Sequence, residues 1–203
     1  MGKLEFDEAK HEYRLEGALL PSVTQILKPL QDFSAVPEDI LERSANFGVA
    51  VHLATALWDQ NDLDMDSLDT AIVPYLEAWK RFCDETKITF EAIEAQVVSK
   101  KYRYAGTLDR IGFLNGKPTV IDIKTGLTNP VIGVQLAGYL VAWNETHVLK
   151  VTRRASVSLR KDGSYRLDWW EDKADWACFL ALLQISNWQL AHGNQIERRN
   201  HGK

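Results

Sequence analysis

The centre of the chain reads Tyr104-Ala-Gly-Thr-Leu-Asp-Arg-Ile-Gly-Phe-Leu-Asn-Gly-Lys-Pro-Thr-Val-Ile-Asp-Ile-Lys-Thr-Gly126. Two apolar, largely β-branched runs flank its Asn115-Gly116 pair, and such a pair is the strongest short-range signal for a β-hairpin. Apolar residues fall on both faces of the expected strands, as in an interior sheet that is covered on both sides. This segment therefore predicts a buried hairpin.

Three of the charged residues in this apolar hairpin are expected on one face. A two-residue loop at Asn115-Gly116 places Asp109 directly opposite Asp122, with Cβ atoms roughly 5 Å apart, and alternation puts Lys124 on the same face. Two facing carboxylates repel each other, and a divalent cation is the simplest group that offsets the repulsion. Solvent screening at a hairpin mouth is the alternative, but charged residues seldom lie inside such a sheet unless they are paired or bind a metal. The pattern predicts a metal-dependent site for phosphoryl transfer.

Length and composition predict one ordinary globular domain. The chain has 203 residues, of which 45% are hydrophobic and 26% are charged, as in soluble proteins with a proper core. Its two cysteines, Cys83 and Cys178, have no metal-ligand spacing, so we expect a reducing setting and no iron–sulfur cluster. No apolar run reaches the roughly 20 residues that span a bilayer, and the first residues do not resemble a signal peptide. These observations lead us to expect a cytoplasmic protein.

The charge distribution leaves contact with nucleic acid open. The formal net charge is −4, which gives no overall electrostatic footprint for nucleic acid and counts mildly against a nuclease. A local groove can still be basic on an acidic molecule. Two basic clusters can each follow a phosphate backbone or form a solvated face: Lys100, Lys101, Arg103 and Arg110 beside the hairpin, and Arg153, Arg154, Arg160 and Lys161 later in the chain.

Periodicity and turn signals place the remaining elements. A capping box at Ser22 and Gln25 opens a short helix, and Pro74 bends a longer helix or marks its true start. The expected strands are 4–6, 12–15, 90–99, 104–114, 119–125, 148–159 and 165–170, and the expected longer helices are 37–59, 66–86, 130–144 and 172–191. Helices around a central mixed β-sheet predict an α/β (α+β layered) fold, with one domain at 1–193 and a polar, mobile tail at 194–203.

Four motifs, in this order along the chain, resemble the PD-(D/E)XK nuclease superfamily, and especially its RecB-type branch with phage and mitochondrial exonucleases. They are Gly48-Val-Ala-Val-His52, Gly106-Thr-Leu-Asp109, Asp122-Ile-Lys124 and Gln135-Leu-Ala-Gly-Tyr139. The early Pro21-Ser-Val-Thr-Gln-Ile-Leu27 also resembles the opening of the phage and mitochondrial members. The Asp-x-Lys form replaces the commoner Glu-x-Lys, a variation that the superfamily tolerates. The resemblance covers roughly residues 12–143 and implies a restriction-endonuclease-like core.

The resemblance implies a role for each residue of these motifs. Asp109 and Asp122 would bind Mg²⁺ or Mn²⁺ together with the backbone carbonyl of Ile123. The imidazole of His52 would join them and favour Mn²⁺, although His52 taken alone would more simply be a core residue. Lys124 would orient the attacking water, stabilise developing charge and, near a metal, carry a lowered pKa.

Further residues are candidates for contact with the substrate or for support of the metal ligands. Gln135 and Tyr139 share one helix face, and in the family this pair lies beside the active site; outside that context they form the polar edge of a packing helix. Glu94 is a further acidic ligand, a supporting group or a plain surface carboxylate. Ser22 and Thr24 can donate to a phosphate, although capping alone explains Ser22.

Together the residues and the resemblance lead us to expect a Mg²⁺- or Mn²⁺-dependent deoxyribonuclease that hydrolyses phosphodiester bonds. Its exonuclease action on single-stranded DNA or duplex ends comes only from the resemblance. The alternatives are a structure-specific endonuclease and a catalytically silent module that binds nucleic acid or a recombination partner on the same fold. The resemblance also implies a bacterial cell or a phage-infected host, recombination or replication proteins as possible partners, and no membrane partner.

Overall fold

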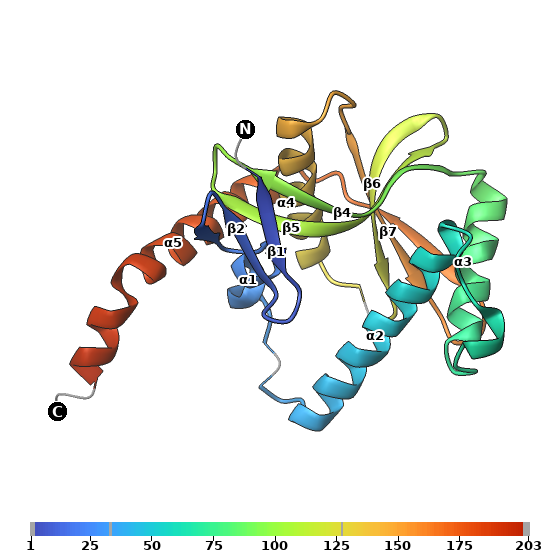
Figure 1. Cartoon of the computed structure of the whole chain (residues 1–203), viewed down its shortest axis with the longest axis horizontal. Helices are drawn as coiled ribbons and strands as arrows, with labels where there is room; N and C mark the ends of the chain where they lie inside the picture. Colours follow the sequence, from blue (N-terminus) through green and yellow to red (C-terminus); the bar gives the residue numbers. More distant parts are fainter. Residues whose placement is uncertain (1–2, 33, 127, 201–203) are drawn as a thin grey trace.

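The computed structural model describes residues 3–32, 34–126 and 128–200. The fold is α+β, with a five-stranded mixed sheet flanked by helices, as the sequence predicts (Figure 1). All neighbouring strands in this sheet are antiparallel except the third and fourth, which are parallel. In spatial order the strands are β4 (Thr89–Ser99), β5 (Tyr104–Leu114), β6 (Lys117–Lys124), β7 (Arg153–Leu159) and β8 (Tyr165–Trp169).

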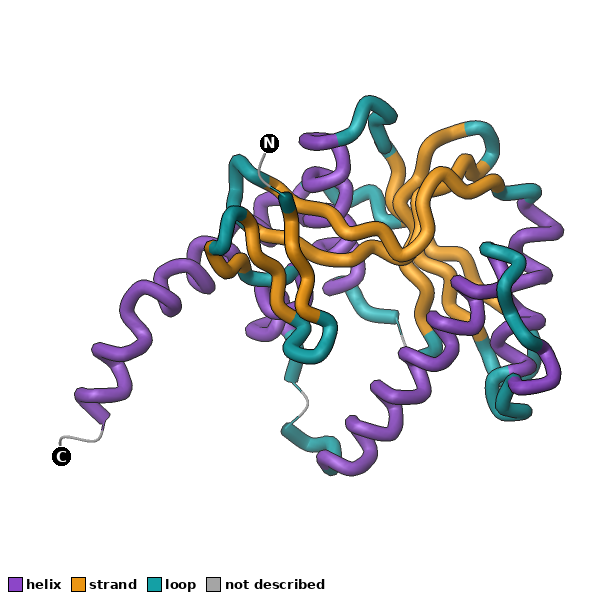
Figure 2. Tube along the Cα trace, in the orientation of Figure 1, coloured by secondary structure: helices purple, strands orange, loops and turns teal. Residues whose placement is uncertain are grey.

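Helices cover both faces of the central sheet. They are α1 (Val23–Leu27), α2 (Glu38–Asp59), α3 (Val73–Thr86), α4 (Val131–Thr146) and α5 (Ala174–Asn200), with short 3-10 turns at Lys28–Leu30 and Met65–Ser67. Figure 2 shows the strands between α3 on one side and α4 on the other. α4 is the crossover between β6 and β7, because parallel neighbours need a long connection of this kind.

The β5–β6 hairpin has the predicted register. Both turn residues have positive φ, 53° at Asn115 and 71° at Gly116, which is the backbone of a type I′ turn. The ladder runs from Leu114 opposite Lys117 to Arg110 opposite Ile121. β6 continues beyond Ile121 but pairs there only with β7, so the hairpin strands separate at Asp109. The predicted pairing of Asp109 directly opposite Asp122 is therefore not part of the ladder.

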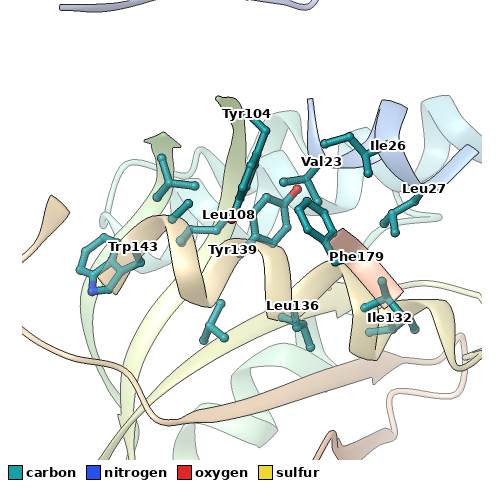
Figure 3. Close-up of a cluster of buried hydrophobic side chains, with 14 of the residues drawn as sticks. Val23, Ile26, Leu27, Tyr104, Leu108, Ile132, Leu136, Tyr139, Trp143 and Phe179 are labelled. Atoms are coloured by element: carbon teal, nitrogen blue, oxygen red, sulfur yellow. The ribbon is translucent and has the colours of Figure 1, made fainter. Parts of the chain in front are cut away.

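One hydrophobic core lies between the sheet and the helices α1, α4 and α5 (Figure 3). Leu136 and Tyr139 of α4 lie close to Phe179 of α5 and to the apolar side chains of α1. The hydroxyl of buried Tyr104 donates to the carbonyl oxygen of Gly138 at 2.7 Å, so the polar end of this ring is satisfied. This core fixes α4, which carries two of the predicted site residues.

A second hydrophobic core covers the other face of the sheet, under α2 and α3. Trp79 and Phe82 of α3 are fully buried there against Ile121 and Ile123 of β6. The alternate residue Val120 belongs to the first core. β6 is therefore buried on both faces, as its continuous apolar sequence predicts.

A separate three-stranded sheet, β1 (Leu4–Asp7), β2 (Glu12–Leu15) and β3 (Ala18–Leu20), packs beside β5. The chain joins the main sheet where Ala105 of β5 donates its N–H to the Pro21 carbonyl at 3.1 Å. The capping box at Ser22 and Gln25 then opens α1, as predicted. The third strand was not expected, because its apolar run is only three residues long.

Several element boundaries differ from the prediction. The expected helix at 66–86 is a 3-10 turn followed by α3, with Pro74 in its first turn, so the proline marks the true start. The strand expected from residue 148 begins only at Arg153.

The end predicted for the last helix at Ala191 is wrong. The backbone of α5 remains helical to Asn200, since the added residues include the good helix formers Gln, Glu and Arg. Residues 201–203 lie outside the described part of the chain, and the mobility expected for the segment stays a prediction. Among the described residues, no helix has the length and apolar character needed to cross a bilayer.

Candidate active site

A cavity of about 580 Å³ opens where β5 and β6 separate. Its walls come from the N-terminal sheet, α1, α2, α4 and the strands β4 to β6; Figure 1 shows the N-terminal strands and α2 on either side of this region. All nine side chains that the sequence singled out line this one cavity, namely Ser22, Thr24, His52, Glu94, Asp109, Asp122, Lys124, Gln135 and Tyr139. The structure therefore brings together residues that are more than 100 positions apart in the chain.

Asp109 lies at the point where the hairpin strands part. Its Oδ2 accepts a hydrogen bond from the backbone N–H of Ile123 at 2.6 Å, in place of a ladder partner. Its Oδ1 lies 3.5 Å from Nδ1 of His52, which α2 supplies from across the cavity. Burial alone would lower the pKa of His52, but the carboxylates of Asp109 and Asp122 outweigh it and raise the pKa to about 9. Conversely, His52 and Lys124 hold the pKa of buried Asp109 below its ordinary value.

Glu94 reaches the same point from β4. It lies opposite Asp109 between two paired positions of the β4–β5 ladder, and its φ is +47°, which is rare for a residue with a side chain. One ligand atom from each of Glu94, Asp109 and His52 lies within 4.8 Å of the other two. Burial and the charge of Asp109 raise the pKa of Glu94. Of the three roles that the sequence left open for Glu94, this geometry is least consistent with a plain surface carboxylate.

Asp122 and Lys124 form a second charged pair in the cavity. The ammonium nitrogen of Lys124 lies 2.8 Å from Oδ2 of Asp122 and donates to Oδ1 at 3.1 Å and to Oε1 of Gln135 at 3.3 Å. Asp122 is only 3% exposed, and its Oδ2 has no partner in hydrogen-bond geometry. Burial raises the pKa of Asp122, aided by Asp109 and opposed by Lys124. Burial would lower the pKa of Lys124, but the two aspartates raise it.

Tyr139 and Gln135 lie on the face of α4 that lines the cavity. Tyr139 is 5% exposed, and burial raises the pKa of its hydroxyl well above the ordinary value. A Cβ atom on Gly106 would lie 2.8 Å from the Tyr139 ring, so only glycine at this position of β5 lets the ring lie where it does. Tyr139 packs in the core and Gln135 contacts Lys124, so the pair does not form an exposed polar edge. Contact of the pair with nucleic acid stays a prediction.

Ser22 and Thr24 lie at the start of α1, at the rim of the cavity. The Ser22 hydroxyl accepts from the N–H of Gln25 at 3.1 Å and lies 3.0 Å from the Thr24 hydroxyl. The capping role that the sequence analysis weighed therefore accounts for Ser22. Thr24 is exposed and remains free to contact a ligand.

Arg110 is a site-supporting residue that sequence reasoning missed. Its predicted place in a basic cluster that faces a phosphate backbone or solvent is wrong, because its side chain is fully buried. Its guanidinium donates to Asp59 at 2.8 Å, to Glu94 at 2.9 Å and to Thr55 at 3.3 Å. The sequence did contain a signal for this role, because a charged residue inside an apolar strand requires a buried partner for its charge.

In comparisons with known proteins, no protein-family model matches the chain. No curated protein matches it significantly either.

Proposed function

We propose that this chain is a metal-dependent nuclease of the PD-(D/E)XK type, which hydrolyses DNA phosphodiester bonds and acts on single-stranded DNA or DNA ends. The observation that carries the proposal is the convergence of His52, Glu94 and Asp109 beside the Asp122–Lys124 pair in one cavity. Paired acids, an imidazole and one ammonium group are the set that such chemistry needs.

The donors in the cavity suit a hard divalent cation. Carboxylate oxygens dominate the set, as Mg²⁺ and Mn²⁺ require, and the single nitrogen of His52 favours Mn²⁺. The buried Oδ2 of Asp122 contacts the Lys124 ammonium at 2.8 Å without hydrogen-bond geometry, so it is a further oxygen that a cation bound beside Lys124 would contact. A cation bound here would neutralise the phosphate oxygens and lower the pKa of an attacking water.

Lys124 and Gln135 position the reacting groups in this proposal. The Lys124 ammonium is held from two sides, by Asp122 and by the Gln135 side chain, so it points into the cavity in a fixed direction. A fixed ammonium group stabilises the charge that develops on the phosphate without reorganising during the reaction. Its raised pKa keeps it protonated and able to donate at neutral pH in the metal-free protein.

Exposed apolar side chains at the cavity favour a single strand. Val49 and Leu53 of α2 line the cavity and are 68% and 58% exposed, so they offer apolar contact to unstacked bases.

The direct test uses the full chain with end-labelled single-stranded DNA, duplex DNA and RNA. We expect cleavage of single-stranded DNA with Mn²⁺ or Mg²⁺ and none with EDTA, and the position of the retained label gives the polarity. Asp122→Asn should abolish cleavage, whereas the control Glu91→Gln, which removes an exposed carboxylate from β4, should cleave at the wild-type rate.

Calorimetry with Mn²⁺ adds an independent readout to the cleavage assay. The wild-type chain should bind the ion, and Asp109→Asn should weaken binding at least tenfold. Cleavage that persists in EDTA would refute the metal role. Binding of single-stranded DNA without cleavage under any condition would instead support a catalytically silent module.

A further inference from the structure

A second cavity, of about 520 Å³, opens at the carboxyl ends of the parallel strands β6 and β7. The loop residues Thr125 and Gly126 separate it from Lys124, the last residue of β6. Its basic lining residues are Arg160, Lys161 and Arg166. Two of these, Arg160 and Lys161, belong to a basic cluster for which the sequence left a phosphate-backbone role open, and the proposed catalytic site does not use them.

Sheet register connects the two cavities. Lys124 of β6 pairs with Ser158 of β7, and Ser158 pairs with Arg166 of β8. Residues in register on neighbouring strands project from the same face of a sheet. One polar row therefore runs across three strands, from the lysine of the candidate active site to the arginine of the second cavity.

Ser158 is the most informative member of this row. It is only 5% exposed, and its hydroxyl oxygen has no hydrogen-bond partner among the described residues. A buried hydroxyl without a partner is destabilising, because it has lost its hydrogen bonds to water. Since Ser158 lines the cavity, a ligand there can supply the missing partner.

The charges around the cavity favour an anion. Within the described part of the chain, Arg160 and Lys161 form no ion pair, whereas Arg166 bonds Asp168 and Thr128. The acidic lining residue Asp162 is engaged by the N–H and hydroxyl of Ser164.

We propose that this second cavity binds a phosphate group of the same nucleic-acid strand whose scissile phosphate lies beside Lys124. The inference rests on the proposed nuclease function and adds a subsite to it. The Ser158 hydroxyl donates to a phosphate oxygen, and Arg160 and Lys161 balance its charge. Lys124 and Ser158 are one strand spacing apart, about 5 Å, so the subsite takes a phosphate close to the scissile one along the strand.

The test compares Ser158→Ala and Lys161→Ala with the control Lys117→Ala, which removes the same charge at the opposite, exposed end of β6. Fluorescence anisotropy in EDTA measures the affinity for single-stranded DNA without cleavage. We expect Ser158→Ala to weaken binding about tenfold, Lys161→Ala severalfold, and Lys117→Ala not at all. Wild-type affinity in both Ser158→Ala and Lys161→Ala would overturn the subsite.

Thermal unfolding separates a ligand role of Ser158 from a structural one. The hydroxyl has no internal partner, so Ser158→Ala should unfold at or above the wild-type temperature while losing affinity for DNA. A lower unfolding temperature with unchanged affinity would assign Ser158 to the fold alone.

Inorganic phosphate and a nucleoside monophosphate are added as competitors, because each carries the phosphate group that the cavity is proposed to bind. If either binds through Ser158 without displacing the oligonucleotide, the cavity takes free phosphate and the strand subsite is refuted. Failure of this inference is distinct from failure of the nuclease proposal. If the wild-type chain never cleaves DNA, but Ser158→Ala still binds DNA more weakly than wild type, only the nuclease proposal is refuted.

Discussion

Lys124 has partners on both sides, the carboxylate of Asp122 and the side-chain oxygen of Gln135. Lys124→Met removes the ammonium group and keeps most of the aliphatic stem. Because this change leaves His52, Glu94 and Asp109 in place, Mn²⁺ binding should stay within about threefold of wild type, while turnover falls by at least a hundredfold.

Calorimetric Mn²⁺ titration and a cleavage assay on the same preparation check this expectation. Lys80→Met is the matched control, since Lys80 lies on α3, outside the cavity, where its ammonium contacts Glu77 and the Trp58 ring. Near-wild-type turnover in Lys124→Met would remove the lysine from the mechanism.

The His52–Asp109 contact predicts a pH-dependent stability in the metal-free protein. The pKa of His52 is raised from 6.5 to about 9, so the folded state binds this proton more tightly than the unfolded state. Its contribution is fully present below pH 6.5 and is lost as pH rises towards 9. Urea unfolding in EDTA should show a fall in unfolding free energy across this range that is smaller in His52→Gln. Parallel curves for the two proteins would contradict the assigned pKa.

Asp109, Asp122 and Lys124 were predictable from the geometry of the hairpin, in which an Asn-Gly turn sets the register. His52, Gln135 and Tyr139 were expected only from the family resemblance. The role of Glu94 was left open and that of Arg110 was wrong, because these roles depend on a positive φ within β4 and on a partner, Asp59, from a distant helix. Neither feature leaves a periodic signal in the sequence.

At the scale of elements, Arg110 joins α2 to the strands that carry the acids. Arg110→Met would leave Asp59, which is 3% exposed in its side chain, as a buried charge without its main partner. Breaking a buried pair on one side costs about 3–5 kcal/mol. Chemical denaturation should show this loss, whereas Arg43→Met, which breaks an exposed pair with Asp39 on α2, should change stability by less than about 0.5 kcal/mol. Equal effects would contradict the buried network.

Replacing Gly106 and Gly48, two glycines of the family-like motifs, by alanine should change the stability of the fold in opposite directions. Gly106→Ala forces a Cβ atom to 2.8 Å from the Tyr139 ring and should destabilise the fold by about 1–3 kcal/mol. Gly48→Ala meets only the Thr125 hydroxyl at 3.8 Å, and within a helix alanine is favoured by up to about 1 kcal/mol. Thermal unfolding should give a lower unfolding temperature than wild type for Gly106→Ala and an equal or higher one for Gly48→Ala. A stable Gly106→Ala would mean that Tyr139 can move aside.

Element types were more predictable than element ends. α2 was expected at 37–59 and spans Glu38–Asp59, because its length and apolar spacing are unambiguous. The short strand β3 and the true end of α5 escaped prediction, since the first depends on pairing with β2 and the second on a run of residues with good helix propensity but no cap.

At the scale of the whole molecule, a net charge of −4 limits how broadly the surface can attract DNA. Phosphate contacts should then come only from the few basic residues of the two cavities. For about three such contacts, the logarithm of the affinity for single-stranded DNA should fall with the logarithm of the salt concentration with a slope of roughly −2. Anisotropy titrations at several salt concentrations measure the slope. A slope of zero would indicate no phosphate contact, and a much steeper one would indicate a wide basic surface.

The separation of β5 from β6 leaves an open strand edge at which the chain could aggregate in a crowded solution. Residues 104–109 of β5 have no β6 neighbour, and open strand edges of this kind invite pairing with another chain. Pro21 and Ser22 occupy part of this edge through their bridge to Ala105. The N-terminal segment that forms one wall of the cavity thus also shields the molecule from edge-to-edge aggregation.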